Sequence, residues 1–279
     1  MARVNLFIFI IICLSISSVK ATPDSLINYS AYKIKIGYYK DFYVDNLGFI
    51  YLVSENNQIK KYNNRLDSIA IYNNGRLGNI FSVDVSNPLK IQVYYKDYGL
   101  IVTLDQELNS ENVINLSSAS NQQSNFIINS YDNNLWLFDL VNNKLKKIDY
   151  LGNLLLETQD FRLLFETPFY PTQILDYNST LFLYDMKLGE IKAFNYFGSL
   201  INQFYFPKVK TIFIDNGNII SYDSTALIFC NTKYTSTQLS KIYTNLNFSA
   251  AQKVIIKKGC LYLLNKEGLH IYKRINFNE

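Results

Sequence analysis

Five aspartates recur at comparable places along this chain of 279 residues. Asp45, Asp84, Asp132, Asp176 and Asp215 each lie in or near a turn that follows an apolar run. Carboxylate oxygens gathered at one place can bind Ca²⁺, and two carboxylates about 5–10 Å apart can cleave a glycosidic bond. Asp is also selected in β-turns because its side chain binds the local backbone. The five aspartates are therefore weak candidates for a calcium site, and ordinary turn formation is the favoured explanation.

Other side chains offer little chemistry. His270 is the only histidine, and it lies in the alternating run Leu269–Tyr272, which favours a strand residue over a catalytic base. A zinc or copper site normally collects three or four nitrogen or sulfur ligands. No G-x-S-x-G, P-loop or G-x-G-x-x-G motif is present. We therefore predict no catalytic residue, no cofactor and no zinc, copper or iron.

Two cysteines, Cys230 and Cys260, lie in apolar strand patterns in the second half of the chain. Two cysteines do not make a disulfide scaffold. We expect two buried free thiols, and a single bridge between neighbouring repeats remains the alternative.

The elements that position these residues are short strands. The stretch from Phe42 to Tyr72 holds four apolar runs separated by turns rich in Asn, Asp and Gly, which predicts a four-stranded antiparallel meander. Comparable turns recur at intervals of about 40–45 residues. The residues that align in them are Asn46, Asn87, Asn133, Asn178, Asn216 and Lys258.

Six such units, each of four strands, predict an all-β fold: a six-bladed β-propeller of antiparallel blades. The sixth unit stops at Ile275 without a fourth strand, whereas a spare strand, Tyr32–Tyr38, precedes the first unit. We therefore expect the N-terminal strand to complete the last blade and close the ring. A β-sandwich, a β-solenoid or two smaller β domains would use the same local signals.

Residues 1–21 have the order of a secretory signal peptide: a basic start at Arg3, an apolar stretch and small residues before Ala21. The apolar stretch is about eleven residues, too short to span a bilayer, although an uncleaved anchor is the alternative. Residues 22–279 then form a single exported propeller domain, periplasmic or extracellular. No later segment is a transmembrane candidate, and the net charge of +4 is spread too evenly for nucleic-acid binding.

The mature protein is predicted to begin at Thr22, directly after the small residue at which a signal peptidase would cut. N-terminal sequencing or the intact mass of the exported protein measures this. Retention of residues 1–21 would contradict it.

Several stretches carry a family resemblance. The run Phe42–Gly48, the segment from Ser86 to Asp105, the run Asn134–Asp139 and the closing Lys266–Tyr272 resemble a group of exported β-propeller proteins from Bacteroidetes-type Gram-negative bacteria. More distantly, the repeats are similar to NHL-type and TolB-like propellers. The resemblance implies an exported propeller, and the distant families imply protein binding. It transfers no functional residue.

These observations favour a non-catalytic, exported scaffold that binds a protein or a ligand in the periplasm or cell envelope. Its partner would be an envelope protein or a glycan that the sequence does not identify, and we expect a monomer or a subunit of a larger complex. The alternative is a propeller-type glycan hydrolase or lyase that uses carboxylates of the channel. The 23 Tyr and 19 Phe invite sugar stacking, but most occupy strand positions, where core packing accounts for them.

Overall fold

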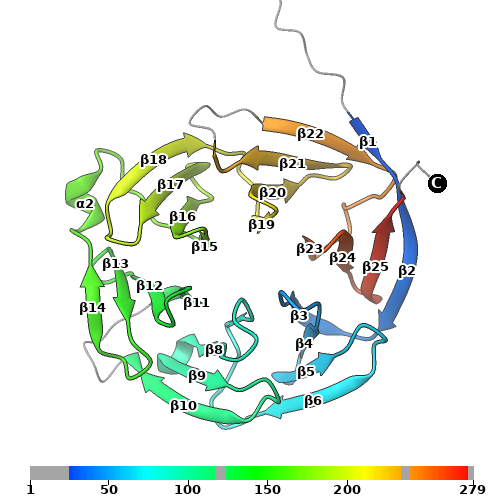
Figure 1. The fold of residues 1–279 in the computed structure, drawn as a ribbon, viewed down its shortest axis with the longest axis horizontal. Helices are drawn as coiled ribbons and strands as arrows, with labels where there is room; N and C mark the ends of the chain where they lie inside the picture. Colours follow the sequence, from blue (N-terminus) through cyan, green and yellow to red (C-terminus); the bar gives the residue numbers. More distant parts are fainter. Residues whose placement is uncertain (1–24, 117–123, 234–238, 276–279) are drawn as a thin grey trace, which may run out of the picture.

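Six sheets form a closed ring around a central channel (Figure 1). The computed structural model describes residues 25–116, 124–233 and 239–275, so the predicted leader and its cleavage site lie outside the described residues. The predicted fold is confirmed: the chain is a six-bladed β-propeller of four-stranded antiparallel blades. Within the described residues, no helix is long and apolar enough to cross a membrane.

Each blade uses consecutive strands, counted from the channel outward. Blade 1 consists of β3 (Tyr39–Val44), β4 (Ile50–Ser54), β5 (Gln58–Tyr62) and β6 (Ser68–Asn73). Blade 2 consists of β7 (Ser82–Asp84), β8 (Ile91–Tyr95), β9 (Leu100–Leu104) and β10 (Ser110–Asn115), with the 3-10 turn η1 (Lys96–Tyr98) before β9. Blade 3 consists of β11 (Ser124–Asn129), β12 (Leu135–Asp139), β13 (Lys144–Ile148) and β14 (Leu154–Glu157).

The remaining blades follow the same order. Blade 4 consists of β15 (Gln173–Tyr177), β16 (Thr180–Asp185), β17 (Glu190–Asn195) and β18 (Leu200–Tyr205). Blade 5 consists of β19 (Phe213–Asp215), β20 (Asn218–Tyr222), β21 (Ala226–Asn231) and β22 (Leu239–Thr244). Blade 6 takes three strands from the end of the chain: β23 (Lys253–Lys257), β24 (Cys260–Leu264) and β25 (Gly268–Arg274).

The ring closes as the spare and missing strands predict. β2 (Tyr29–Ile36) pairs antiparallel with β25 and is the outer strand of blade 6. A feature that the sequence did not predict precedes it: β1 (Ser25–Ile27) pairs parallel with β22 and adds a fifth strand to blade 5. The start of the chain therefore binds two neighbouring blades.

The core lies between the blades. The second strand of every blade is almost wholly buried, because it is covered on both faces by neighbouring blades. Six hydrophobic clusters fill the six blade interfaces, and the one between blades 6 and 1 includes Phe42, Leu52, Leu264 and Ile271. Closure therefore rests on side-chain packing as well as on strand pairing.

The turn chemistry is repetitive. At the hairpins that join the first and second strands, Asn133, Asn178, Asn216 and Lys258 all adopt positive φ. In blades 4, 5 and 6 these hairpins have two-residue loops, which require positive φ. The turns before the fourth strands use another device. The side chains of Asn63, Asp105, Asp149 and Asn195 each accept two backbone N–H groups, from the second and fourth residues that follow.

The long connection between blades 3 and 4 contains a short helix. α2 spans Phe161–Leu164, and the carboxylate of Asp160 caps its N-terminus by accepting the Arg162 N–H. Phe161 is fully buried and stacks on Phe194 of blade 4, with ring centroids 5.2 Å apart. Aromatic packing thus fixes this connection against the ring.

Cys230 and Cys260 are both free in the structure. The expectation of two free thiols is therefore confirmed, although Cys260 is only partly buried. Burial raises the pKa of the Cys230 thiol, which keeps it in the unreactive protonated form.

Candidate binding site in the central channel

The first strands of the six blades line the channel (Figure 1). Their starts line one cavity and their ends line another, so all six run in the same direction. We call the end where these strands begin the N-side opening and the end where they finish the C-side opening. A cavity of about 700 Å³ lies at the N-side opening, and one of about 580 Å³ lies at the C-side opening. Cavities of this size accommodate small-molecule ligands.

Two of the five candidate aspartates do not line either cavity. Asp45 is buried, and its carboxylate accepts the N–H groups of Leu47 and Phe49 at 2.8 and 2.9 Å and the Tyr51 hydroxyl at 2.9 Å. Asp132 is exposed in its turn and forms an ion pair with Lys147. Local turn chemistry and a neighbouring lysine occupy these two carboxylates.

Asp84 lines both cavities from blade 2. Its carboxylate accepts the N–H and hydroxyl of Ser86, at 2.9 and 3.0 Å, and the N–H of Asn129 from blade 3. Burial raises the pKa of Asp84, although these hydrogen bonds oppose the shift. The side chain therefore ties two neighbouring blades together.

Asp176 and Asp215 line the C-side cavity from blades 4 and 5. Burial raises the pKa of Asp176 to about 6, against the opposing effect of a hydrogen bond from the Tyr196 hydroxyl. Burial also raises the pKa of Asp215, and the nearby Lys257 opposes that rise. Asp84, Asp176 and Asp215 are thus the candidates that the ring brings to one opening.

Among the residues that the structure describes, no three His, Cys, Asp or Glu side chains are grouped closely enough to hold a metal ion. The ring places the three channel aspartates on separate blades, and each is engaged by its own neighbours. Calcium binding at the five aspartates therefore stays a prediction, and no close group of acidic side chains among the described residues supports it.

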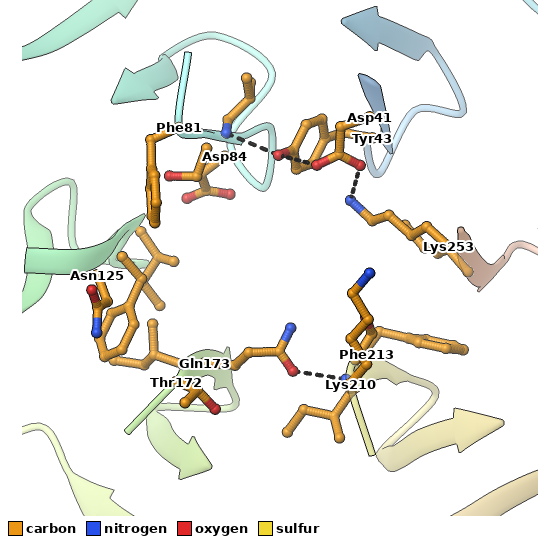
Figure 2. Close-up of a pocket in the computed structure, with 18 of the residues that line it drawn as sticks. Asp41, Tyr43, Phe81, Asp84, Asn125, Thr172, Gln173, Lys210, Phe213 and Lys253 are labelled. Atoms are coloured by element: carbon orange, nitrogen blue, oxygen red, sulfur yellow. Dashed lines mark hydrogen bonds and ion pairs between the residues drawn. The ribbon is translucent and has the colours of Figure 1, made fainter. Parts of the chain in front are cut away.

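The N-side cavity contains functional side chains that sequence reasoning missed. Asp41 of blade 1 accepts a hydrogen bond from the Tyr43 hydroxyl at 2.7 Å and pairs with Lys253 of blade 6 at 2.8 Å. Lys253 also donates to the Phe42 carbonyl and lies over the Tyr43 ring, 3.9 Å from its centroid. Figure 2 shows this group on one side of the cavity.

Lys210, Gln173 and Asn125 are further polar residues of the N-side cavity lining. The Gln173 side-chain oxygen accepts the Ile212 N–H at 2.8 Å, and the Asn125 oxygen accepts the Lys96 ammonium at 2.6 Å. These residues lie just before the first strands or at their starts. An aligned column of strand starts in the six repeats is the signal that could have identified them.

His270 lies away from the channel, on the third strand of blade 6. Its Nε2 is 3.2 Å from the Asn265 side-chain oxygen and 3.7 Å from Glu267. We expect His270→Ala to leave any ligand binding unchanged, and elemental analysis to find no stoichiometric zinc, copper or iron. One equivalent of zinc that is lost together with binding in this variant would contradict the prediction.

No protein-family model and no curated protein matches the chain. Solved structures that resemble it include a streptogramin B lyase, with 12% identity and a TM-score of 0.60 over 89% of this chain and 97% of that one. A gluconolactonase from Xanthomonas campestris has 12% identity and a TM-score of 0.58 over 91% and 99% of the two chains. The extracellular domain of a hybrid two component system from B. thetaiotaomicron has 15% identity and a TM-score of 0.52 over 83% and 33%.

These similar structures are propellers of varied roles. At such low identity the likeness shows the fold alone. The class of protein is therefore a six-bladed β-propeller, and the role of this chain has to be argued from its own channel.

Proposed function

We propose that the protein is an exported, non-catalytic propeller that binds a glycan or an envelope protein at its central channel. The observation that carries the proposal is that the channel carboxylates already have hydrogen-bond and ion-pair partners. Asp41, Asp84 and Asp176 each accept hydrogen bonds or ion pairs from within the propeller, so they act as parts of a rigid lining. Rigid polar groups around a preformed cavity suit binding, since little ordering is required when the ligand arrives.

Export is supported by the order of charged, apolar and small residues in positions 1–21. Glycans and envelope proteins are present in the periplasm and outside the cell, so we propose one of these two classes as the binding partner. The even surface charge and the absence of basic runs argue against nucleic acid.

The test is whether a ligand is bound and returned unchanged. Immobilised protein of residues 22–279 would be incubated with glycans and proteins from cell-envelope extracts, and the retained molecules would be analysed by mass spectrometry before and after. Retention with unchanged mass supports the proposal. A product that wild type and the exposed-turn control Asp67→Asn both form, but Asp176→Asn does not, would overturn it.

The alternative is a glycan hydrolase or lyase, and one observation favours it. The pKa of Asp176 is raised to about 6 in a cavity that also contains Asp84, and a carboxyl with such a pKa can donate a proton near neutral pH. If Asp176 acts as the acid, the rate should fall as the pH rises through about 6, since the carboxyl then loses its proton. A rate that is flat between pH 5 and 8 would exclude this role.

A further inference from the structure

We propose that the N-side cavity is a binding site for a carboxylate-bearing sugar, such as a uronic acid, with the carboxylate held by Lys210 and the side-chain amide of Gln173. This inference rests on the proposed binding function and specifies its ligand class. It depends on an imbalance between donors and acceptors in the cavity wall.

Two of the three carboxylates that line this cavity, Asp41 and Asp84, are occupied. Asp41 accepts from the Phe42 N–H, the Tyr43 hydroxyl and Lys253. Asp84 accepts from Ser86 and Asn129. These carboxylates are therefore poorly placed to take further donors from a ligand.

Two donors of the cavity wall, the Lys210 ammonium and the Gln173 amide, are unoccupied among the residues that the structure describes. Within the described parts of the chain, no hydrogen-bond or ion-pair partner contacts the Lys210 ammonium. The oxygen of the Gln173 amide accepts the Ile212 N–H, which leaves its NH₂ group for the cavity. Ammonium and amide groups that lack acceptors are satisfied by an anion, and a carboxylate has lone pairs for several of them.

The positions of the charges agree with this assignment. Figure 2 shows Lys210 and Lys253 entering the cavity from the same side, with Phe81 and Asp84 across from them. Of the other charged lining residues, Lys40 donates to the Ile80 carbonyl at 2.8 Å, and Glu55 lies in the turn after β4. The wall formed by blades 4, 5 and 6 is therefore the one that attracts an anion.

The cavity also has room and apolar surface for a ring. Its volume is about 700 Å³, and Phe81 lines it with 47% of its surface exposed. The less polar face of a sugar ring stacks on aromatic side chains. A ligand with an apolar ring face and a carboxylate therefore matches the two kinds of side chain in this lining.

Calorimetric titration of the 22–279 protein with D-glucuronate and with D-glucose tests the inference, since the two probes differ in one carboxylate. We expect saturable binding of glucuronate, at least tenfold weaker binding of glucose, and loss of affinity as salt is added. Lys210→Met should weaken glucuronate binding by roughly tenfold or more. Gln173→Glu keeps an acceptor for the Ile212 N–H but puts a negative charge in the site, so it should abolish binding.

The matched control is Lys208→Met, which removes an exposed lysine from the same connection outside the cavity lining. It should bind glucuronate like wild type. Inorganic phosphate serves as a third probe, and phosphate that competes as strongly as glucuronate would overturn the sugar part of the inference. Equal affinity for glucose and glucuronate, equal affinities of the two lysine variants, or no saturable binding would each overturn it entirely.

The outcomes separate this inference from the proposed function. If glucose binds as tightly as glucuronate, the proposed anion site is wrong, but the proposed binding function is supported. If the protein converts a glycan to product and this activity depends on Asp176, the proposed non-catalytic role is wrong. The proposed anion site is not affected by that result.

Discussion

Deletion of residues 29–38 is expected to lower the stability of the propeller by several kcal/mol, a large share of a typical total of about 5–15 kcal/mol. β2 pairs with β25 along its whole length, and Tyr29 is buried in the cluster between blades 5 and 6. The deletion leaves the backbone groups of β25 unpaired at an open edge. Thermal unfolding should show a lower midpoint, and light scattering should show association through that edge.

A point substitution tests the same closure more finely. At Gly268, φ is +147° and an added Cβ would lie 2.2 Å from the Lys35 carbonyl oxygen, so Gly268→Ala should push β2 away from β25. At Gly259, φ is +72° and no atom lies within 4 Å of an added Cβ, which makes Gly259→Ala the control for backbone strain alone. A truncated protein that stays monomeric with an unchanged midpoint would show that β2 does not close the ring.

Asp139→Asn is expected to cost about 3–5 kcal/mol because it leaves a buried lysine without its charge partner. Lys146 pairs with Asp139 at 2.8 Å, and the side chains are only 5% and 0% exposed. Glu157, 3.8 Å from Lys146, is too distant and too exposed to replace Asp139. Denaturant unfolding of the variant measures the loss.

The control for this pair is the double variant Asp139→Asn with Lys146→Met, which removes both charges. It should recover part of the stability, since no unpaired charge remains buried. A double variant that is less stable than Asp139→Asn alone would contradict the interpretation.

The same pair predicts a pH dependence. Burial alone would raise the pKa of Asp139, but hydrogen bonds from Lys146 and Asn142 outweigh it and hold that pKa below its ordinary value of 3.8. The stabilisation should therefore be complete above about pH 4 and should be lost as the pH falls through the lowered pKa. Asp139→Asn should lack this component of acid unfolding.

The ring was predictable because its signals are local and repeated. The turn residues recur every 40 or so positions and, at Asn133, Asn178, Asn216 and Lys258, adopt the positive φ that tight hairpins need. The complementary missing and spare strands then specified closure. β1 escaped prediction because three residues, Ser25–Ile27, pair in parallel with a strand far along the chain, and no local pattern encodes that partner.

The candidate site was only partly predictable. The sequence pattern picked out five turn aspartates, and three of them, Asp84, Asp176 and Asp215, line the C-side opening. It could not separate them from Asp45 and Asp132, whose partners are fixed by the turn and by Lys147. Asp41 and Lys253 meet only because the ring brings the first and last blades together.

The pairing of β2 with β25 also has a consequence for the order of folding. Ile34 pairs with His270, so nearly the whole chain separates the two strands, and such distant contacts form slowly. A chain that emerges N-terminus first carries an unpaired β2 until its last blade has been made. The open ring meanwhile exposes unpaired edges that can recruit other chains. Closure of the ring therefore depends on a contact that forms only after the last blade has been made.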